Sequence, residues 1–105
     1  MIRRPVGGAE VEPRRDEVDG WTGDTLLEFG ASWCPICQAA RPHVDGVVAS
    51  YGVRHVRVED GRGKPLGRSF RVKLWPTLIL MRDGAEVGRT VRPQGPEPIS
   101  ALLQT

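Results

Sequence analysis

Residues 32–37 read Ser32-Trp33-Cys34-Pro35-Ile36-Cys37 and contain both cysteines of the 105-residue chain. They follow an apolar run that is typical of a strand, and the residues after them have helical spacing. If a helix starts here, its free backbone N–H groups and its positive end favour an anion at Cys34. The pKa of the Cys34 thiol is therefore expected to lie below the ordinary value of about 8.5. The spacing predicts that Cys34 and Cys37 form a dithiol that can close as a disulfide and open again.

Cys34 is expected to act as the nucleophile, because the thiolate is the form that attacks a disulfide sulfur. Cys37 lies one turn further along the expected helix, where it should be more shielded. It would resolve the mixed disulfide by attacking the sulfur of Cys34 and releasing the reduced partner. The pair itself would carry the electrons, so no bound metal or organic cofactor is expected.

Three other uses of two cysteines fit this chain less well. A structural disulfide across so short a loop would stabilise the fold little. A zinc site needs four ligands, and His43 and His55 are too far apart for a Cys2His2 site. They are expected to be a helix-surface residue and a strand residue. An iron–sulfur cluster needs four thiolates, and the chain has two cysteines.

The composition fits one globular domain that spans residues 1–105. Hydrophobic residues make up 39% and charged residues 27% of the chain, which is typical of a folded domain with one modest core. Residues 1–20 are the least informative part, because glycine, proline and charged residues outnumber the apolar positions there. We expect a poorly defined N-terminal segment, in which residues 14–19 fit either a short strand or a short helix.

The net charge of +2 does not indicate a nucleic-acid-binding protein. The basic residues in the second half of the chain have few aromatic residues among them, so a solvated basic face is expected. These residues are Arg62, Lys64, Arg68, Arg71 and Lys73. No apolar run reaches the length of a membrane span, and the N-terminal residues lack the apolar core of a secretory signal. A cytoplasmic protein without membrane partners is therefore expected.

Hydrophobic spacing predicts an α/β fold. The apolar runs with strand character are residues 25–30, 53–59, 77–81 and 86–91. The segments with helical spacing are residues 35–52, 65–72 and the tail from residue 97. Pro42 should kink the first helix, and Asp83-Gly84 should form a hairpin turn between the last two strands. Because a strand, a helix and a strand in this order form a crossover with two parallel strands, we expect a mixed sheet of four to five strands flanked by helices on both faces.

Together these motifs resemble the thioredoxin family. Trp33 precedes the Cys-x-x-Cys pair, Pro42 lies five residues beyond the second cysteine, and Trp75-Pro76-Thr77 precedes an apolar strand that ends in Asp-Gly. Each motif lies where thioredoxins have its counterpart, and the match runs from about residue 26 to residue 91. The resemblance implies a thioredoxin-like fold and the reduction of protein disulfides by dithiol exchange.

The resemblance also implies a docking surface around the cysteines. Pro76 would be a cis proline that faces them, and the cis bond would leave backbone groups of Trp75 free to bind an extended substrate segment. Trp33 would be a rim aromatic that packs over the disulfide. The expected substrate-binding residues are Trp33, Pro35, Ile36, Trp75, Pro76 and Thr77.

Glu28 is expected to relay a proton. Strand alternation places it on one face with Leu26, and a carboxylate in so apolar a strand indicates burial, which favours the protonated form. It could then exchange a proton with Cys37 through water. Thioredoxins have a buried acid, usually Asp, six residues before the first cysteine, and commonly have Lys at the position of Arg57, which would hold Glu28 ionised. In the alternative interpretation, Glu28 reaches solvent and Arg57 belongs to the surface.

Departures from the family keep two alternative functions open. The pair between the cysteines is Pro35-Ile36 where typical thioredoxins have Gly-Pro, and Cys-Pro-x-Cys is the glutaredoxin arrangement. This favours a glutathione-dependent oxidoreductase, although Trp33 is a thioredoxin feature and no Gly-Gly-x-Asp stretch follows Pro76. The other alternative is a non-catalytic interaction module with the same fold. Arg92 stands near the position where thioredoxins have a glycine that lines the binding groove. This difference could change which partners the groove accepts.

The implied partners are proteins that contain a disulfide, with a thioredoxin reductase or a similar protein as the electron donor. We expect a monomer that binds neither nucleic acid nor membranes. The physiological substrate, the donor and the direction of electron flow are left open by the sequence.

Overall fold

The computed structural model describes residues 12–105. In chain order its elements are α1 (Arg15–Asp19), β1 (Asp24–Gly30), α2 (Pro35–Tyr51), β2 (Arg54–Glu59), α3 (Pro65–Ser69), β3 (Thr77–Arg82), β4 (Ala85–Val91) and α4 (Pro96–Leu103). The strands and helices expected from the sequence are present, with ends that differ by a few residues. For residues 14–19 the helix is confirmed, and the rest of the expected N-terminal segment up to residue 11 lies outside the described residues.

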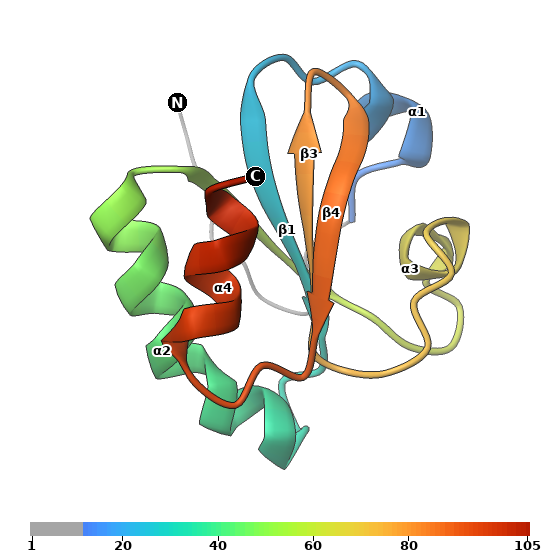
Figure 1. The fold of residues 1–105 in the computed structure, drawn as a ribbon. Helices are drawn as coiled ribbons and strands as arrows, with labels where there is room; N and C mark the ends of the chain where they lie inside the picture. Colours follow the sequence, from blue (N-terminus) through green and yellow to red (C-terminus); the bar gives the residue numbers. More distant parts are fainter. Residues whose placement is uncertain (1–11) are drawn as a thin grey trace.

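The strands form one mixed sheet in the order β2-β1-β3-β4. β1 and β2 are parallel, as the crossover through α2 requires, while β3 is antiparallel to β1 and β4 is antiparallel to β3. The register places Glu28 of β1 opposite Arg57 on one side and Leu78 on the other. Figure 1 shows α2 and α4 on one face of the sheet and α1 and α3 on the other. The expected mixed sheet with helices on both faces is confirmed.

Strand alternation divides the core into two apolar layers. The layer beneath α2 and α4 consists of Leu26, Val44, Val47, Leu78, Leu80, Ile99 and Leu102. The layer beneath α1 and α3 consists of Val18, Leu27, Phe29, Val58, Leu66, Phe70, Ile79 and Met81. Successive side chains of a strand point to opposite faces, so Glu28 shares its face with Leu26. The carboxylate therefore lies in the layer that α2 covers.

The start and end of α2 follow from its local sequence. Cys34 is the N-cap, and Pro35 occupies the first turn, where a missing backbone N–H costs nothing. Gly52 ends the helix with a φ of 68°, in the left-handed region that suits glycine. Pro42 lies inside the helix. Within residues 12–105 no helix combines the length and the apolar character that crossing a membrane requires.

α3 ends three residues earlier than the sequence predicts, at Ser69. Arg71 has a φ of 58°, which a continuing helix cannot contain. The backbone N–H of Val72 instead bonds back to the carbonyl of Gly67 at 2.9 Å. This turn directs the chain away from α3 and toward the segment before β3.

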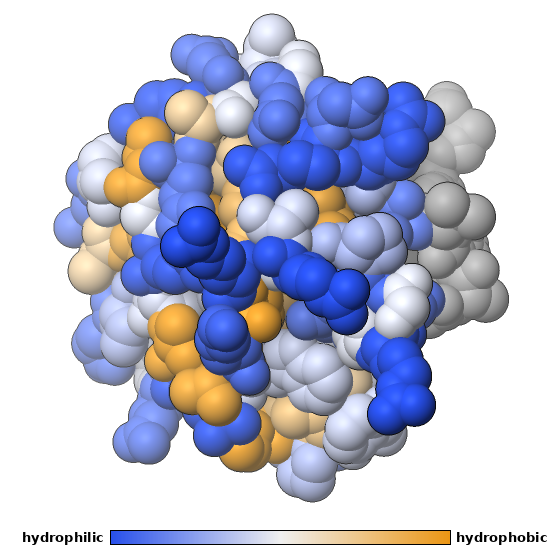
Figure 2. Space-filling view, turned by 90° about the vertical axis from the view of Figure 1, so that its right-hand side faces the viewer, coloured by the Kyte–Doolittle hydropathy of each residue, from blue (hydrophilic) through white to orange (hydrophobic). Residues whose placement is uncertain are grey.

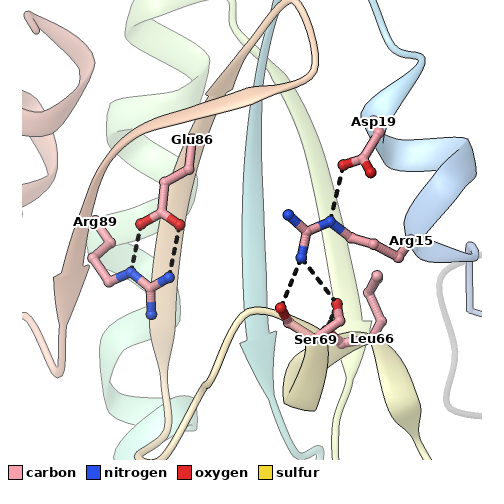
Figure 3. Close-up of polar contacts among 6 residues, drawn as sticks. All are labelled: Arg15, Asp19, Leu66, Ser69, Glu86 and Arg89. Carbon is pink, nitrogen blue, oxygen red and sulfur yellow. Dashed lines mark hydrogen bonds and ion pairs between the residues drawn. The ribbon is translucent and has the colours of Figure 1, made fainter.

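Contacts between α1 and α3 join the described part of the N-terminal segment to the domain. Figure 3 shows Arg15 reaching from α1 to Ser69, whose carbonyl accepts a hydrogen bond from Nη1 at 2.7 Å. The same guanidinium lies 3.8 Å from the ring centroid of Phe70 and pairs with Asp19 at 2.9 Å. Figure 2 looks onto this side of the molecule, where hydrophilic residues cover most of the surface.

Candidate active site

The turn between β1 and α2 places both cysteines at the start of the helix. The Sγ atom of Cys34 accepts a hydrogen bond from the backbone N–H of Cys37 at 3.2 Å. The backbone N–H of Cys34 bonds to the carbonyl of Ala31 at 3.1 Å. From the end of β2, the carboxylate of Glu59 accepts the backbone N–H of Ser32 at 3.0 Å. The turn that carries the cysteines is therefore held by the helix start and by the neighbouring strand.

The Cys34 thiol is easier to ionise than a free thiol. Burial opposes its ionisation, but hydrogen bonds from the Cys37 thiol and from the backbone N–H groups of Cys37 and Ile36 outweigh burial. The positive charge of Arg92 acts in the same direction. Together these interactions lower the pKa of Cys34, in the direction expected for a cysteine at a helix N-cap.

Cys37 has the opposite character. Burial, the hydrogen bond that its thiol donates to Cys34, and the negative charges of Cys34 and Glu28 raise the pKa of Cys37 to about 11. Its side chain fits because Gly30 has no β-carbon, which would lie 2.9 Å from the Cys37 sulfur. The inner thiol therefore keeps its proton until the surroundings of the pair change.

Glu28 belongs to a buried polar cluster on the same face of the sheet. The residue is 2% exposed, and its Oε1 atom lies 2.9 Å from Arg57 Nη2 and 2.7 Å from His55 Nε2. Arg57 also pairs with Asp45 of α2 at 2.9 Å. The predicted burial of Glu28 and its pairing with Arg57 are confirmed, and the alternative in which Glu28 reaches solvent is wrong.

His55 is a member of this cluster that the sequence analysis treats only as a strand residue. A signal was present, because His55 lies two residues before Arg57 and so shares its face of a strand. The parallel pairing of β1 with β2 then brings both side chains to Glu28. His55 is a strand residue, as expected, and its contact with Glu28 at 2.7 Å follows from this register.

Trp33 and Trp75 form an aromatic pair beside the sulfurs. Their ring centroids lie 5.6 Å apart, with an edge-to-face angle of 79°. Trp75 packs against Cys34 and Cys37, and its Nε1 donates a hydrogen bond to Asp60 at 2.9 Å. Trp33 is 69% exposed, so it is a rim residue open to a partner and not a core residue.

The segment before β3 differs in two ways from the expected docking surface. The Trp75-Pro76 bond is cis, as expected, but the Trp75 carbonyl accepts a hydrogen bond from Arg92 Nε at 2.8 Å. Arg92 therefore already occupies one acceptor position of this carbonyl, and an incoming backbone N–H would share the oxygen with it or displace it. Thr77 is buried, and its hydroxyl donates to the Leu74 carbonyl at 2.6 Å. Its side chain supports the turn and does not line the surface.

The remaining predicted site residues lie on α2. Pro35, Ile36 and Pro42 are exposed. Ile36 lines a cleft of about 390 Å³ together with His43 and Arg92. Among residues 12–105 no group of three or more His, Cys, Asp or Glu side chains is arranged to hold a metal ion.

Comparisons with known proteins agree with this geometry. A family model described as Thioredoxin matches residues 14–105. The thioredoxin of Mycolicibacterium smegmatis is 32% identical over 83 residues, which cover 75% of this chain and 74% of that protein. The thioredoxin of Chlamydia pneumoniae is 33% identical over 86 residues, which cover 78% of this chain and 81% of that protein.

A solved structure gives the same result. Reduced thioredoxin 2 from Pseudomonas aeruginosa PAO1 matches with a TM-score of 0.80 and 50% sequence identity, covering 89% of this chain and 87% of that chain. The family model spans nearly all of the described residues, and the cysteine pair opens α2 as a Cys-x-x-Cys motif. The chain therefore belongs to the thioredoxin family and is a thiol–disulfide oxidoreductase.

Proposed function

We propose that this oxidoreductase reduces disulfides in proteins through Cys34 and Cys37. The observation that carries the proposal is the hydrogen-bonded sulfur pair at the start of α2, in which the pKa of the outer thiol is lowered and that of the inner thiol is raised. Such a pair has one sulfur ready to attack and one that stays protonated until the mixed disulfide has formed. A thioredoxin reductase or a similar donor would supply the electrons.

The exchange proceeds in two steps. The Cys34 thiolate attacks one sulfur of the substrate disulfide, forms a mixed disulfide and expels the other substrate sulfur as a thiolate, which takes a proton from solvent. Cys37 then loses its proton, and its sulfur attacks Cys34. The second substrate sulfur leaves with the electron pair, and the protein ends with a Cys34–Cys37 disulfide. Two electrons have passed to the substrate, and the donor returns them to the protein.

Glu28 is the proposed proton acceptor for Cys37. It is buried on the face of the sheet that α2 covers, and its charge contributes to the raised pKa of Cys37. A carboxylate coupled in this way can take the thiol proton through a water molecule as the thiolate forms. Arg57 is the proposed supporting residue, because it pairs with Glu28 and with Asp45 and so keeps the carboxylate in place.

The proposed docking surface surrounds Cys34. Trp33 and Ile36 are exposed apolar side chains on either side of Pro35, and Trp75 closes the surface toward β3. Pro76 and Thr77 are buried below this surface, where they would hold the backbone of Trp75 in position. A substrate segment would cover the sulfurs and exclude water while the mixed disulfide exists.

The proposed setting is the cytoplasm, where a Cys-x-x-Cys pair is kept reduced. The chain would act there as one domain and as a monomer. No bound cofactor is needed for the proposed reaction, because the dithiol itself carries the two electrons.

The equilibrium reduction potential of the Cys34/Cys37 pair tests the proposal. It can be measured against a glutathione series by tryptophan fluorescence, because Trp75 packs against the cluster that contains Cys34 and Cys37. We expect a potential near the thioredoxin level of about −270 mV. A potential near about −120 mV would make the pair an oxidant and overturn both the reductase and its cytoplasmic setting.

Two further results separate the alternatives. Rapid turnover of a glutathione mixed disulfide would favour the glutathione-dependent enzyme, and we expect this turnover to be slow. If the fluorescence shows no reversible transition, the protein is an interaction module with a thioredoxin fold. The double variant C34S/C37S is the control, because it must show no transition in any case.

A further inference from the structure

A cleft with basic walls adjoins the active site on the side of the molecule that carries α3. Its volume is about 730 Å³, and it lies among the loop after β2, α3 and the segment before Trp75. Its cationic lining residues are Arg62, Lys64, Arg68, Arg71 and Lys73. Figure 2 looks onto the side that carries α3 and shows how strongly hydrophilic its surface is.

The charges of this basic cleft are not neutralised by the described chain. Among residues 12–105 no carboxylate lies within ion-pair distance of any of the five cations, whereas Arg82 and Arg89 pair with Asp24 and Glu86. Asp60 is the acidic residue in the lining, and its Oδ2 already accepts the Trp75 Nε1 hydrogen bond at 2.9 Å. Gathered like charges repel one another and attract an anion from solution.

Trp75 connects this cleft to the reacting sulfurs. Its side chain lines the cleft and also packs against Cys34 and Cys37. A substrate segment that is joined to Cys34 and crosses the ring of Trp75 therefore enters the basic cleft. Acidic residues next to the disulfide in that direction of the substrate chain would then lie near the five cations.

We propose that the basic cleft binds an acidic segment of the substrate protein beside the disulfide that is being reduced. The inference rests on the proposed reductase function and names the class of substrate that it prefers. Complementary charges of this kind act mainly by steering the encounter, so they raise the rate of the first attack by Cys34. They have no effect on the later attack of Cys37 on Cys34.

Two cysteine peptides activated as mixed disulfides with thionitrobenzoate test this proposal. One carries four glutamates beside the cysteine and the other carries four glutamines. The variant R68Q/K73Q removes two cleft charges, and R14Q/R54Q removes two charges elsewhere on the surface. At low salt we expect R68Q/K73Q to slow reduction of the glutamate peptide by about threefold to tenfold. The glutamine peptide and the control variant should be unaffected.

Each other outcome contradicts the proposal. If R14Q/R54Q slowed reduction of the glutamate peptide as much as R68Q/K73Q does, the net charge of the protein alone would attract the peptide. Slowing of both peptides would mean that the cleft variant has damaged the site, whereas slow reduction by the wild-type protein would count against the reductase function itself. The difference should vanish at high salt, because the screening length falls to about 3 Å at 1 M. Binding of a single-stranded oligonucleotide that depends on Arg68, without preference for the glutamate peptide, would assign the cleft to nucleic acid.

An independent observation concerns the polar cluster around Glu28. Its Oε1 atom contacts both His55 and Arg57, at 2.7 and 2.9 Å. The side chain of His55 is 16% exposed, while that of Glu28 is 3% exposed. An imidazole can gain and lose a proton between pH 5 and 8, whereas a guanidinium stays charged. His55 is thus the contact of Glu28 that can both exchange a proton and reach solvent.

The geometry points to His55 as the group that passes the proton of Cys37 from Glu28 to solvent. This inference rests on the proposed relay. The Cys37 thiol gives its proton to Glu28 through water, Glu28 gives it to His55, and the imidazolium releases it to solvent. The electron pair left on the Cys37 sulfur forms the bond to Cys34, and the substrate sulfur leaves. The charged groups that face the Glu28–His55 pair are Arg57 on β2, and Asp45 and Cys37 on α2.

Release of thionitrobenzoate from its symmetric disulfide separates the two steps. The first equivalent reports the attack by Cys34, and the second reports the attack by Cys37. In H55Q, which keeps a hydrogen-bonding side chain but cannot take up the proton, we expect the second release to be slowed about tenfold near pH 7 and the first to be unchanged. The matched control is H43Q on α2, which should behave like the wild type.

Chemical rescue tests the proton transfer itself. Added imidazole should restore the second release in H55A, while a buffer without a comparable base should not. A second release in H55Q with the wild-type rate and pH profile would overturn the role of His55. If the wild-type protein released only one equivalent, the resolving role of Cys37 would fail instead, so the two failures are distinguishable.

Discussion

The two cysteines belong to one short motif, yet the regions around them differ. Around Cys34 lie the backbone N–H groups of the helix start and the positive charge of Arg92, which lower the pKa of Cys34. Cys37 is buried and lies near the negative charge of Glu28. Both raise its pKa, which is about 11. The two side chains are chemically identical, so their positions relative to the start of α2 decide which cysteine attacks first.

The largest expected effect comes from removing the inner sulfur. C37S should still attack a disulfide through Cys34, but the mixed disulfide should persist, with the second thiol release slowed by more than about a thousandfold. Counting the thionitrobenzoate equivalents released per protein measures this directly. C34S should release neither equivalent in the same time. Normal release of two equivalents by C37S would show that the two regions do not have separate roles.

A substitution at Glu28 tests the role of the carboxylate near Cys37. E28Q keeps the shape of the side chain but removes its ability to accept a proton, so we expect the second release to be slowed by about 10- to 100-fold near neutral pH. The first release should stay within about twofold of the wild type, because the relay acts after it. Thermal unfolding of E28Q serves as the control for folding. An unchanged rate of the second release across the neutral range would exclude Glu28 from the mechanism.

A substitution at Gly30 tests whether the Cys37 sulfur needs the space left by the missing β-carbon. In G30A the new β-carbon would lie 2.9 Å from the Cys37 sulfur, so either the sulfur moves or the strand shifts. We expect a loss of about 1 to 3 kcal/mol in the free energy of unfolding, measured in urea, together with a slower second release. G46A is the matched control, because a β-carbon at Gly46 meets no atom within 4 Å and alanine favours the helix.

Arg92 tests the outer side and should have the smallest effect. R92G removes the charge that helps to lower the pKa of Cys34, so that pKa should rise. Less thiolate is then present below that pKa, and alkylation of Cys34 at mildly acidic pH should be slowed about twofold. At alkaline pH, where the thiolate forms in both proteins, the rates should converge. A lower pKa in R92G would contradict the role of the charge.

Most of the fold could be predicted from the sequence because its signals are local. The apolar runs of β1 and β3, the capping residues of α2 and the Asp83-Gly84 turn each act within a few residues. α3 is shorter than its apolar spacing predicts, since Arg71 has a positive φ and the Val72 N–H bonds back to Gly67 as the chain turns toward β3. Local spacing contains no information about that return.

The site was predicted less completely, because part of it depends on contacts between distant segments. The two cysteines, Glu28 and Arg57 could be found from spacing and family resemblance. The contact of His55 with Glu28 depends on the register between two strands, and the contact of Arg92 with the Trp75 carbonyl joins residues 17 positions apart. The family resemblance predicts Thr77 on the docking surface, but its hydroxyl bonds to the Leu74 carbonyl, and the sequence of a turn does not reveal this direction.

The outer strands of the sheet have a consequence for association with other chains. Among the strands of residues 12–105, β2 and β4 lie at the edges of the sheet, and an exposed edge can recruit a strand from another chain. β4 carries the Glu86–Arg89 ion pair seen in Figure 3, and its register shifts between Leu80 and Met81 of β3. Charge and irregularity of this kind discourage edge-to-edge association. The edge at β4 is thereby a poor place for another chain to add a strand, which leaves the surface around the cysteines for the proposed substrate.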